Sequence, residues 1–286
     1  MKYLLTVVLF LLLVWPDYAA EGPRIFILTD LEGVGGVNNS EEQLLPGQRR
    51  YDESRKLLVG ELNAAVQGVL KAGAGEVVIW DGHDGSRTLS IDDIPPEAKL
   101  IQGKPTPANY YLSDRRFGGI LFIGQHAMAG AKNAILAHSQ SFTVQNLYLN
   151  GKPVGEIGQM AAIAGYFNIP VIMLAGDQAA CDEVLTIQPK AEIVAVKALV
   201  GKGSSLSLSH AEARKQIEAK ARRAVERLPE FSPWKIEGPI ELKFEYYPET
   251  PGGAASEMSQ GKQVLPRTAI YRGRTVLEAY EEWLGK

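Results

Sequence analysis

The sequence predicts an α/β fold, in which a mostly parallel sheet is covered by helices and a smaller α+β subdomain follows at the C-terminal end. Two observations predict this fold. Short continuous apolar runs, such as RIFILTD and EVVIWDGHD, alternate with longer segments of helical periodicity. Polar residues and glycines also follow these runs, as expected where a buried strand of an α/β sheet ends in a loop.

The elements of the main layer follow in order. The first apolar run, Arg24 to Asp30, leads into a glycine-containing loop. A helix is expected over Tyr51 to Ala72, where apolar side chains recur at helical spacing until glycines end the pattern. A hairpin with the turn Asn150-Gly151 precedes a helix over Glu156 to Phe167. The remaining apolar runs are EVVIWDGHD, GGILFIGQHAM, VIMLAGD and EIVAVKALV. Five apolar strands separated by helices predict a parallel sheet that is covered on both faces.

The pattern of apolar and charged residues changes beyond about residue 200. A charged helix is expected over His210 to Leu228, with Ser209 and Glu212 as its capping box. An alternating strand, IELKFEYY, then the run TAIYR and an amphipathic helix over Thr275 to Leu284 complete the chain. We therefore expect a catalytic α/β domain at residues 21–200, which holds the candidate metal ligands described below, and a C-terminal subdomain at residues 201–286.

Residues 1–20 have the pattern of a signal peptide. Lys2 precedes an unbroken apolar run from Leu4 to Trp15, and the small residues Ala19 and Ala20 follow. The run is too short to span a bilayer comfortably, and no cysteine follows it to accept a lipid. We expect cleavage near Ala20 and an exported protein, periplasmic or secreted. An uncleaved anchor is the alternative, because Tyr18 fits poorly at a usual small-residue position.

Net charge and cysteine content limit the classes of partner and of thiol chemistry that the sequence predicts. The formal net charge is −3, without a long run of one sign, so nothing predicts a nucleic-acid partner. Cys181 is the only cysteine, which excludes an intramolecular disulfide. We expect Cys181 to pack in the interior, since no cationic residue stands near it in the sequence to activate the thiol.

Carboxylates and imidazoles follow the apolar strands. Asp30 and Glu32 lie two residues apart at the end of the first strand, so they can project to one side if the backbone stays extended. Two neighbouring carboxylates repel unless one takes up a proton or both bind a cation. His83 and His126 follow the second and third long apolar runs, at the edge where an open α/β sheet binds ligands.

His138 and Glu156 complete this constellation. His138 is twelve residues beyond His126, and Glu156 opens the helix after the hairpin. Taken singly, each residue is more simply a helix cap, a loop hydrogen-bonder or a half-buried side chain. Mixed oxygen and nitrogen donors that converge on one rim favour zinc or a similar transition ion. Two aspartates, Asp81 and Asp84, either orient a ligand imidazole or cap the next turn.

Five motifs, in this order, resemble the D-aminopeptidase metallopeptidase family of the DppA type: TDLEG, DGHDGS, FIGQHA, LAHS and NGKPVGEIG. The resemblance runs from about residue 24 to about residue 199 and thins in the C-terminal third. It implies two zinc ions bridged by Asp30, with Glu32 and His126 completing one site. It implies His83 and Glu156 at the other site, and His138 as the catalytic histidine. It also implies a ring-like homo-oligomer, a decamer.

The function expected from the residues and the resemblance is hydrolysis of short peptides with an N-terminal D-amino acid, such as D-Ala peptides, by a dinuclear zinc aminopeptidase. Other divalent metals, such as manganese or cobalt, also suit these ligands. One alternative is a dinuclear metallohydrolase of L-peptides, other amides or phosphate esters, because similar sites serve all of them. The other is an exported, non-catalytic metal- or peptide-binding protein.

Overall fold

The computed structural model describes residues 22–103, 111–113, 116–247 and 268–285. A seven-stranded sheet forms the centre, in the order β3-β2-β1-β4-β7-β8-β9. Its strands are β1 (Arg24–Thr29), β2 (Glu76–Asp81), β3 (Ala98–Ile101), β4 (Phe117–Gln125), β7 (Val171–Asp177), β8 (Glu192–Gly201) and β9 (Ser204–Ser207). All neighbours pair in parallel except β9, which is antiparallel to β8. The expected mostly parallel sheet is confirmed, with β3 and β9 added to the five strands of the sequence analysis.

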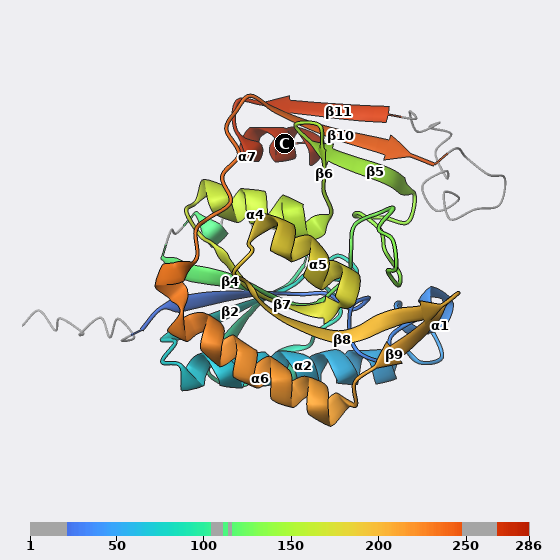
Figure 1. Cartoon of the computed structure of the whole chain (residues 1–286), viewed down its shortest axis with the longest axis vertical. Coiled ribbons are helices and arrows are strands. Elements are labelled where there is room, and N and C mark those ends of the chain that lie inside the picture. The colour runs from blue at the N-terminus through green and yellow to red at the C-terminus, as the bar shows by residue number, and fades with distance from the viewer. Residues whose placement is uncertain (1–21, 104–110, 114–115, 248–267, 286) are drawn as a thin grey trace, which may run out of the picture.

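Helices cover both faces of this sheet (Figure 1). On one face lie α4 (Glu156–Tyr166) and α5 (Gln178–Ile187), and on the other α2 (Tyr51–Lys71) and α6 (His210–Glu226). A short helix, α1 (Ser40–Gln43), and two 3₁₀ turns, η1 (Ile91–Asp93) and η2 (Leu228–Glu230), lie in the connections. Strand β1 shows why both faces are covered: Phe26 and Leu28 pack in the core on the α4 side, whereas Ile25 and Ile27 pack on the α2 side.

A second, four-stranded sheet has the order β11-β10-β5-β6 and is antiparallel. It contains β5 (Val144–Leu149), β6 (Lys152–Pro153), β10 (Ile240–Tyr246) and β11 (Thr268–Gly273), and α7 (Val276–Trp283) packs against it. The β5-β6 hairpin turns at Asn150 and Gly151, with φ of 48° and 75°, as the sequence predicted. Figure 1 shows this small sheet and α7 on the side of the molecule where α4 lies.

The expected boundary near residue 200 does not match this arrangement. Strand β9 extends the large sheet, and α6 packs along α2 beneath it, so residues 204–226 belong to the main layer. The small sheet instead combines C-terminal strands with the β5-β6 hairpin from the middle of the chain. A sequence boundary cannot describe this grouping, because the small sheet pairs strands that are about a hundred residues apart.

Two further expectations concern the termini and the cysteine. The expected signal peptide, residues 1–20, lies outside the described residues. Within the described part of the chain, no helix has the length and apolar character needed to cross a membrane. Cys181 is buried in α5 and unpaired, as predicted, and burial followed by the nearby Asp177 and Asp182 raises its pKa to about 12. A thiol in this environment is inert at neutral pH.

Candidate metal centre

The parallel register brings the carboxyl ends of β1, β2 and β4 to one edge of the large sheet. Thr29 at the end of β1 is the register partner of Asp81 on β2 and of Ile123 on β4. Asp30 and His83 therefore leave neighbouring strands at the same level, and His126 follows β4 directly. This is the rim at which open α/β sheets bind ligands.

Close packing of the loop after β1 against the end of β4 places Asp30 and Glu32 beside His126. The Gly33 N–H donates to the Gly124 carbonyl at 2.7 Å, and the Asp30 N–H donates to the Ile123 carbonyl at 2.9 Å. Gly124 has a φ of +74°, and a Cβ at this position would stand 2.2 Å from the Asp30 carbonyl oxygen. Glycine is required here by both conformation and space.

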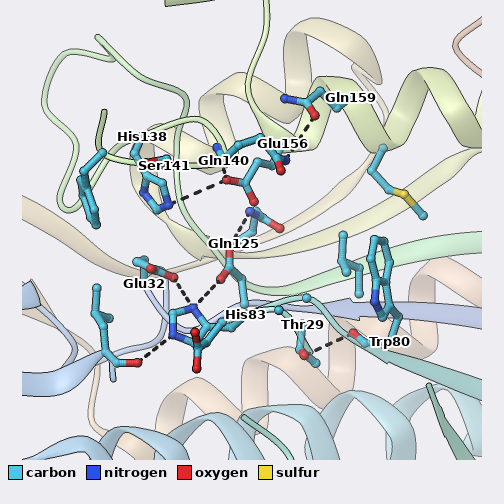
Figure 2. A pocket seen from close by; sticks show the side chains of 18 of the residues that line it. Thr29, Glu32, Trp80, His83, Gln125, His138, Gln140, Ser141, Glu156 and Gln159 are labelled. Atoms are coloured by element: carbon cyan, nitrogen blue, oxygen red, sulfur yellow. Dashed lines mark hydrogen bonds and ion pairs between the residues drawn. The ribbon is translucent and has the colours of Figure 1, made fainter. Parts of the chain in front are cut away.

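All six predicted residues lie in this region. Asp30 occupies the centre: its Oδ1 is 3.4 Å from His83 Nδ1 and its Oδ2 is 3.2 Å from His126 Nε2. Glu32 Oε2 lies 3.1 Å from His83 Nδ1. Glu156 Oε1, at the start of α4, lies 3.6 Å from His126 Nε2 and 3.8 Å from His138 Nε2. Figure 2 shows Glu32, His83, His138 and Glu156 turned toward a common space.

Three of the histidines are oriented by backbone carbonyl groups. His83 Nε2 lies 2.8 Å from the Leu44 carbonyl, His126 Nδ1 lies 2.9 Å from that of Ala127, and His138 Nδ1 lies 2.9 Å from that of Leu136. A carbonyl only accepts, so each of these ring nitrogens carries the proton. The other nitrogen of each ring faces the cluster, where a bound metal would take its lone pair, and this is how ligand histidines are held in metal proteins.

Buried atoms in the cluster lack partners that a cation would supply. Glu32 Oε2 and His126 Nε2 are buried, and each faces an ionisable side chain, at 3.1 and 3.2 Å, without making a well-aligned hydrogen bond among the described residues. Buried polar groups are almost always satisfied, so such a pair at the centre of a cluster of donors indicates a ligand. Carboxylate oxygens and imidazole nitrogens match the preferences of zinc. The residues therefore fit a zinc site.

The grouping of ligand atoms agrees only in part with that implied by the resemblance. Ligand atoms of Asp30, Glu32 and His126 lie within 4.8 Å of one another, which is the set expected at one ion. Glu156, however, groups with His126 and His138 within the same distance, whereas His83 contacts Asp30 and Glu32. The division of the ligands between two ions stays a prediction.

Protons stabilise the carboxylates of this cluster when no cation does. Burial opposes charge on His83, but the carboxylates of Glu32 and Asp30 outweigh it and raise the pKa of His83 to about 12. The pKa of His126 is also well above its ordinary value, because Asp30 and Glu156 outweigh burial. Burial likewise opposes charge on Asp30, yet the neighbouring imidazoles hold its pKa well below the usual range. Binding a metal must therefore displace protons.

His138 lies between two rings at the mouth of the site. Its ring stacks on His126 at 3.9 Å with an interplanar angle of 13°, and on Phe142 at 4.3 Å. Leu136, whose carbonyl holds the ring, has a φ of +56°, a strained conformation for a side chain of this size. These contacts direct Nε2 of His138 toward Glu156 rather than toward solvent.

Asp81 has the capping role that the sequence analysis left open. Its Oδ2 accepts the N–H groups of Thr88 and Leu89 at 2.7 and 2.8 Å, and it makes no hydrogen bond to the His83 ring that the structure describes. Burial raises the pKa of Asp81 to about 6 in spite of these bonds. His210, outside the predicted cluster, lies at the start of α6 with Nε2 3.0 Å from the Leu57 carbonyl.

Four residues that support the site are not identified by the sequence analysis. Gln125 donates from Nε2 to Asp30 Oδ2 at 2.8 Å, and Glu183 Oε2 accepts the Met128 N–H at 2.7 Å. Glu61 Oε1 accepts the Gly35 N–H at 3.1 Å, and the buried Lys197 donates from Nζ to the carbonyls of Glu32 and Val37. Gln125 could have been found from its place before His126. The other three lie in ordinary helix and strand patterns, and only the fold reveals them.

The metal cluster forms part of a pocket of about 660 Å³, which suits a small organic ligand. It extends past the cluster between the large sheet, α4 and α7. Its lining includes the five predicted residues Asp30, Glu32, His83, His138 and Glu156. A pocket of this volume can hold a small molecule beside the metal ligands.

Comparison with known proteins identifies a family, a similar D-aminopeptidase and a similar solved structure. The family model described as D-aminopeptidase matches residues 24–284. A D-aminopeptidase from Bacillus subtilis (strain 168) is 29% identical over 270 residues, which cover 91% of this chain and 95% of that protein.

A solved structure, the Zn-dependent D-aminopeptidase DppA from Bacillus subtilis, described as a self-compartmentalizing protease, superposes with a TM-score of 0.78 at 27% identity. The match covers 92% of this chain and 96% of that one. Because the family model spans nearly the whole of the described chain, this protein belongs to the D-aminopeptidase family.

Proposed function

We propose that this chain is a dinuclear zinc aminopeptidase that hydrolyses short peptides with an N-terminal D-amino acid. The observation that carries the proposal is the convergence of three carboxylates and three histidines, in which the second nitrogen of each ring faces a carboxylate of the cluster. Membership of the D-aminopeptidase family, and the zinc dependence named for the DppA structure, support the metal and the substrate class.

The ligands of the two proposed ions are the five metal residues of the sequence analysis. Asp30 lies between the two groups and is suited to bridge them, since its two carboxylate oxygens face different histidines. Glu32, His83, His126 and Glu156 surround it. Bound zinc would lower the pKa of a water molecule and polarise the scissile carbonyl.

His138 is suited to transfer a proton from the attacking water to the leaving amine. Its Nδ1–H is held by the Leu136 carbonyl, so Nε2 is the nitrogen that can accept a proton from the attacking water. The same nitrogen can then deliver it to the leaving amine. Stacking between His126 and Phe142 holds the ring in place during both transfers.

The direct test is hydrolysis of D-Ala-D-Ala and L-Ala-L-Ala by the purified protein, with added zinc and after chelation. Zinc-dependent cleavage of the D-peptide alone is expected. Cleavage of only the L-peptide would contradict the D-preference, and no cleavage by the zinc-loaded protein would contradict the activity. Metal analysis of the same samples counts the zinc ions per chain, with two expected.

The role of His138 is tested with His138→Ala, and His210→Ala serves as the matched control because His210 lies outside the site. We expect the turnover number of His138→Ala to fall about 100-fold or more, with both zinc ions retained. Full turnover with both ions bound would refute the assignment. The comparisons do not favour the alternatives of a phosphate-ester hydrolase or a binding protein without turnover.

We also propose export and assembly. The pattern of residues 1–20 supports export to the periplasm or medium, where cell-wall fragments are a source of D-Ala peptides. Mass spectrometry of the mature N-terminus tests cleavage near Ala20. The self-compartmentalizing character named for the DppA structure supports a ring-like homo-oligomer, for which we propose ten subunits. Light scattering on the purified protein measures the subunit number, and a monomer would refute the assembly.

A further inference from the structure

One end of the pocket is apolar. We name it the apolar chamber, and it is lined by Leu28, Trp80, Met160, Ile163, Tyr280 and Trp283. Leu28 and Trp80 are register partners on β1 and β2, on the sheet face that α4 covers. In Figure 2, Trp80 lies on the opposite side of the pocket from His138. The chamber is therefore a continuation of the site and is lined by the core of the molecule.

Helix α4 connects the metal cluster directly to this chamber. Glu156, Met160 and Ile163 all line the pocket and are spaced by four and three residues, so they lie on one face of the helix. At 1.5 Å per residue, Ile163 stands about 10 Å along the helix from Glu156. Met160 stands only about 6 Å from Glu156 on the same scale, so a large side chain attached beside the scissile bond enters the chamber at Met160 and extends toward Ile163.

The far wall comes from α7, which packs on the small sheet. Tyr280 and Trp283 are three residues apart on α7, and Trp283 stacks on Phe244 of β10 with ring centroids 5.1 Å apart. Tyr280 is 3% exposed, and its hydroxyl has no hydrogen-bond partner among the residues that the structure describes. A buried, unpaired hydroxyl costs free energy unless a ligand oxygen accepts from it.

Charge divides the pocket into two ends. The charged and imidazole side chains in its lining are Asp30, Glu32, His83, Asp84, His138 and Glu156, which form the metal cluster or adjoin it. None of the six chamber residues carries a charge. The chamber therefore suits an apolar group: an N-terminal ammonium would lose hydration there without a partner, and the Tyr280 hydroxyl could serve only a single ligand oxygen.

We propose that the apolar chamber is a specificity subsite for an aliphatic or aromatic side chain next to the scissile bond, so that the preferred substrates are short peptides with one large apolar residue. This inference rests on the proposed peptidase activity and names its substrate class. A methyl side chain would leave most of the chamber unfilled. Burial of a phenyl group instead is expected to raise kcat/KM about 10- to 100-fold.

The test compares kcat/KM of the zinc-loaded protein for D-Ala-D-Ala, D-Phe-D-Ala and D-Ala-D-Phe. A gain of at least tenfold for D-Phe-D-Ala assigns the chamber to the N-terminal side chain, and the same gain for D-Ala-D-Phe assigns it to the next residue. If D-Ala-D-Ala is cleaved as well as both phenylalanine peptides, the subsite is refuted.

Ile163→Trp tests the location of the subsite, because the larger side chain fills the chamber. We expect the phenylalanine-to-alanine ratio of kcat/KM to fall at least tenfold. Val200→Trp is the matched control, since Val200 is 63% exposed on β8 and is not part of the pocket lining. An unchanged ratio in Ile163→Trp would place the selectivity elsewhere and refute the assignment.

A binding measurement separates failure of the subsite from failure of the activity. Trp80 and Trp283 line the chamber, so their fluorescence should report its occupation by D-phenylalaninamide but not by D-alaninamide. If no D-peptide is cleaved, the proposed function fails, yet a saturable change with D-phenylalaninamide alone still supports the subsite. The absence of such a change, in protein that cleaves D-Ala-D-Ala and prefers neither phenylalanine peptide, refutes the subsite and leaves the activity standing.

Discussion

Glu61 is a buried acid beneath the loop that carries Glu32, and its replacement by glutamine has a predictable effect on stability. The side chain is fully buried in α2; Oε1 accepts the Gly35 N–H, and Oε2 has no partner among the described residues. Burial raises the pKa of Glu61 from 4.5 to about 8, although the Gly35 N–H and Lys197 both act to lower it. The folded protein therefore holds a neutral carboxyl at pH 7.

The sign and size of the effect follow from proton linkage. Between pH 4.5 and about pH 8 the folded protein binds more protons at Glu61 than the unfolded chain, so the free energy of unfolding falls as the pH rises. The stabilising contribution is complete below pH 4.5 and is lost by about pH 8. At 1.36 kcal/mol per pH unit the loss is at most about 5 kcal/mol. Glutamine does not titrate, so Glu61→Gln lacks this term.

The assay is urea denaturation of the metal-free wild type and of Glu61→Gln at pH 5, 6, 7 and 8. Chelation removes the separate pH dependence of metal binding. Relative to wild type, the variant should gain up to about 4 kcal/mol between pH 5 and pH 8. Asp52→Asn, an exposed carboxylate on the same helix, is the control and should keep the wild-type slope. Parallel pH profiles for wild type and Glu61→Gln would refute the reasoning.

Three further predictions concern the metal site. Zinc added to the metal-free protein at pH 7 should release at least one proton per chain, because His83, with a pKa raised to about 12, must lose a proton to bind the metal. Calorimetry in two buffers measures the number of protons released. No release would contradict the ligand role of His83. Gly124→Ala should cost more than about 2 kcal/mol of stability and abolish zinc binding, since the added Cβ would meet the Asp30 carbonyl at 2.2 Å. Gly130→Ala, with a similar φ of +77° but no atom closer than 3.9 Å, should cost only about 1 to 2 kcal/mol by the same denaturation assay. Lys197→Met should weaken zinc binding about 10- to 100-fold, because the hydrogen bonds to the carbonyls of Glu32 and Val37 are lost. Competition with a chromogenic chelator measures the affinity. An unchanged affinity would show that Lys197 does not position the loop that carries Glu32.

The resemblance that the motifs carry was confirmed by the family model and by the solved D-aminopeptidase structure. It was specific because five short motifs occurred in the same order, and three of them, TDLEG, DGHDGS and FIGQHA, combined a strand end with polar and glycine residues. The mostly parallel sheet followed from the same strands, since a continuous apolar run of five or six residues is stable only where both faces are covered. The assigned roles of the site residues and the export signal stay predictions.

By itself, the sequence determined five strands of the main sheet, the helices between them and the residues that meet at its carboxyl edge. These features are local: apolar periodicity selects each element, and parallel strands bring the residues that follow them to one rim. Asp30, His83 and His126 could be identified for this reason.

Only the tertiary structure decided which elements form the small sheet and which groups support the metal ligands. The partners of the three site histidines are main-chain carbonyls, which any residue type supplies and no sequence pattern marks. Lys197 and Glu61 occupy ordinary strand and helix positions, and their importance arises from burial beneath the Glu32 loop. The apolar chamber likewise depends on α7 returning to α4 from the end of the chain, a long-range contact that composition and spacing do not encode.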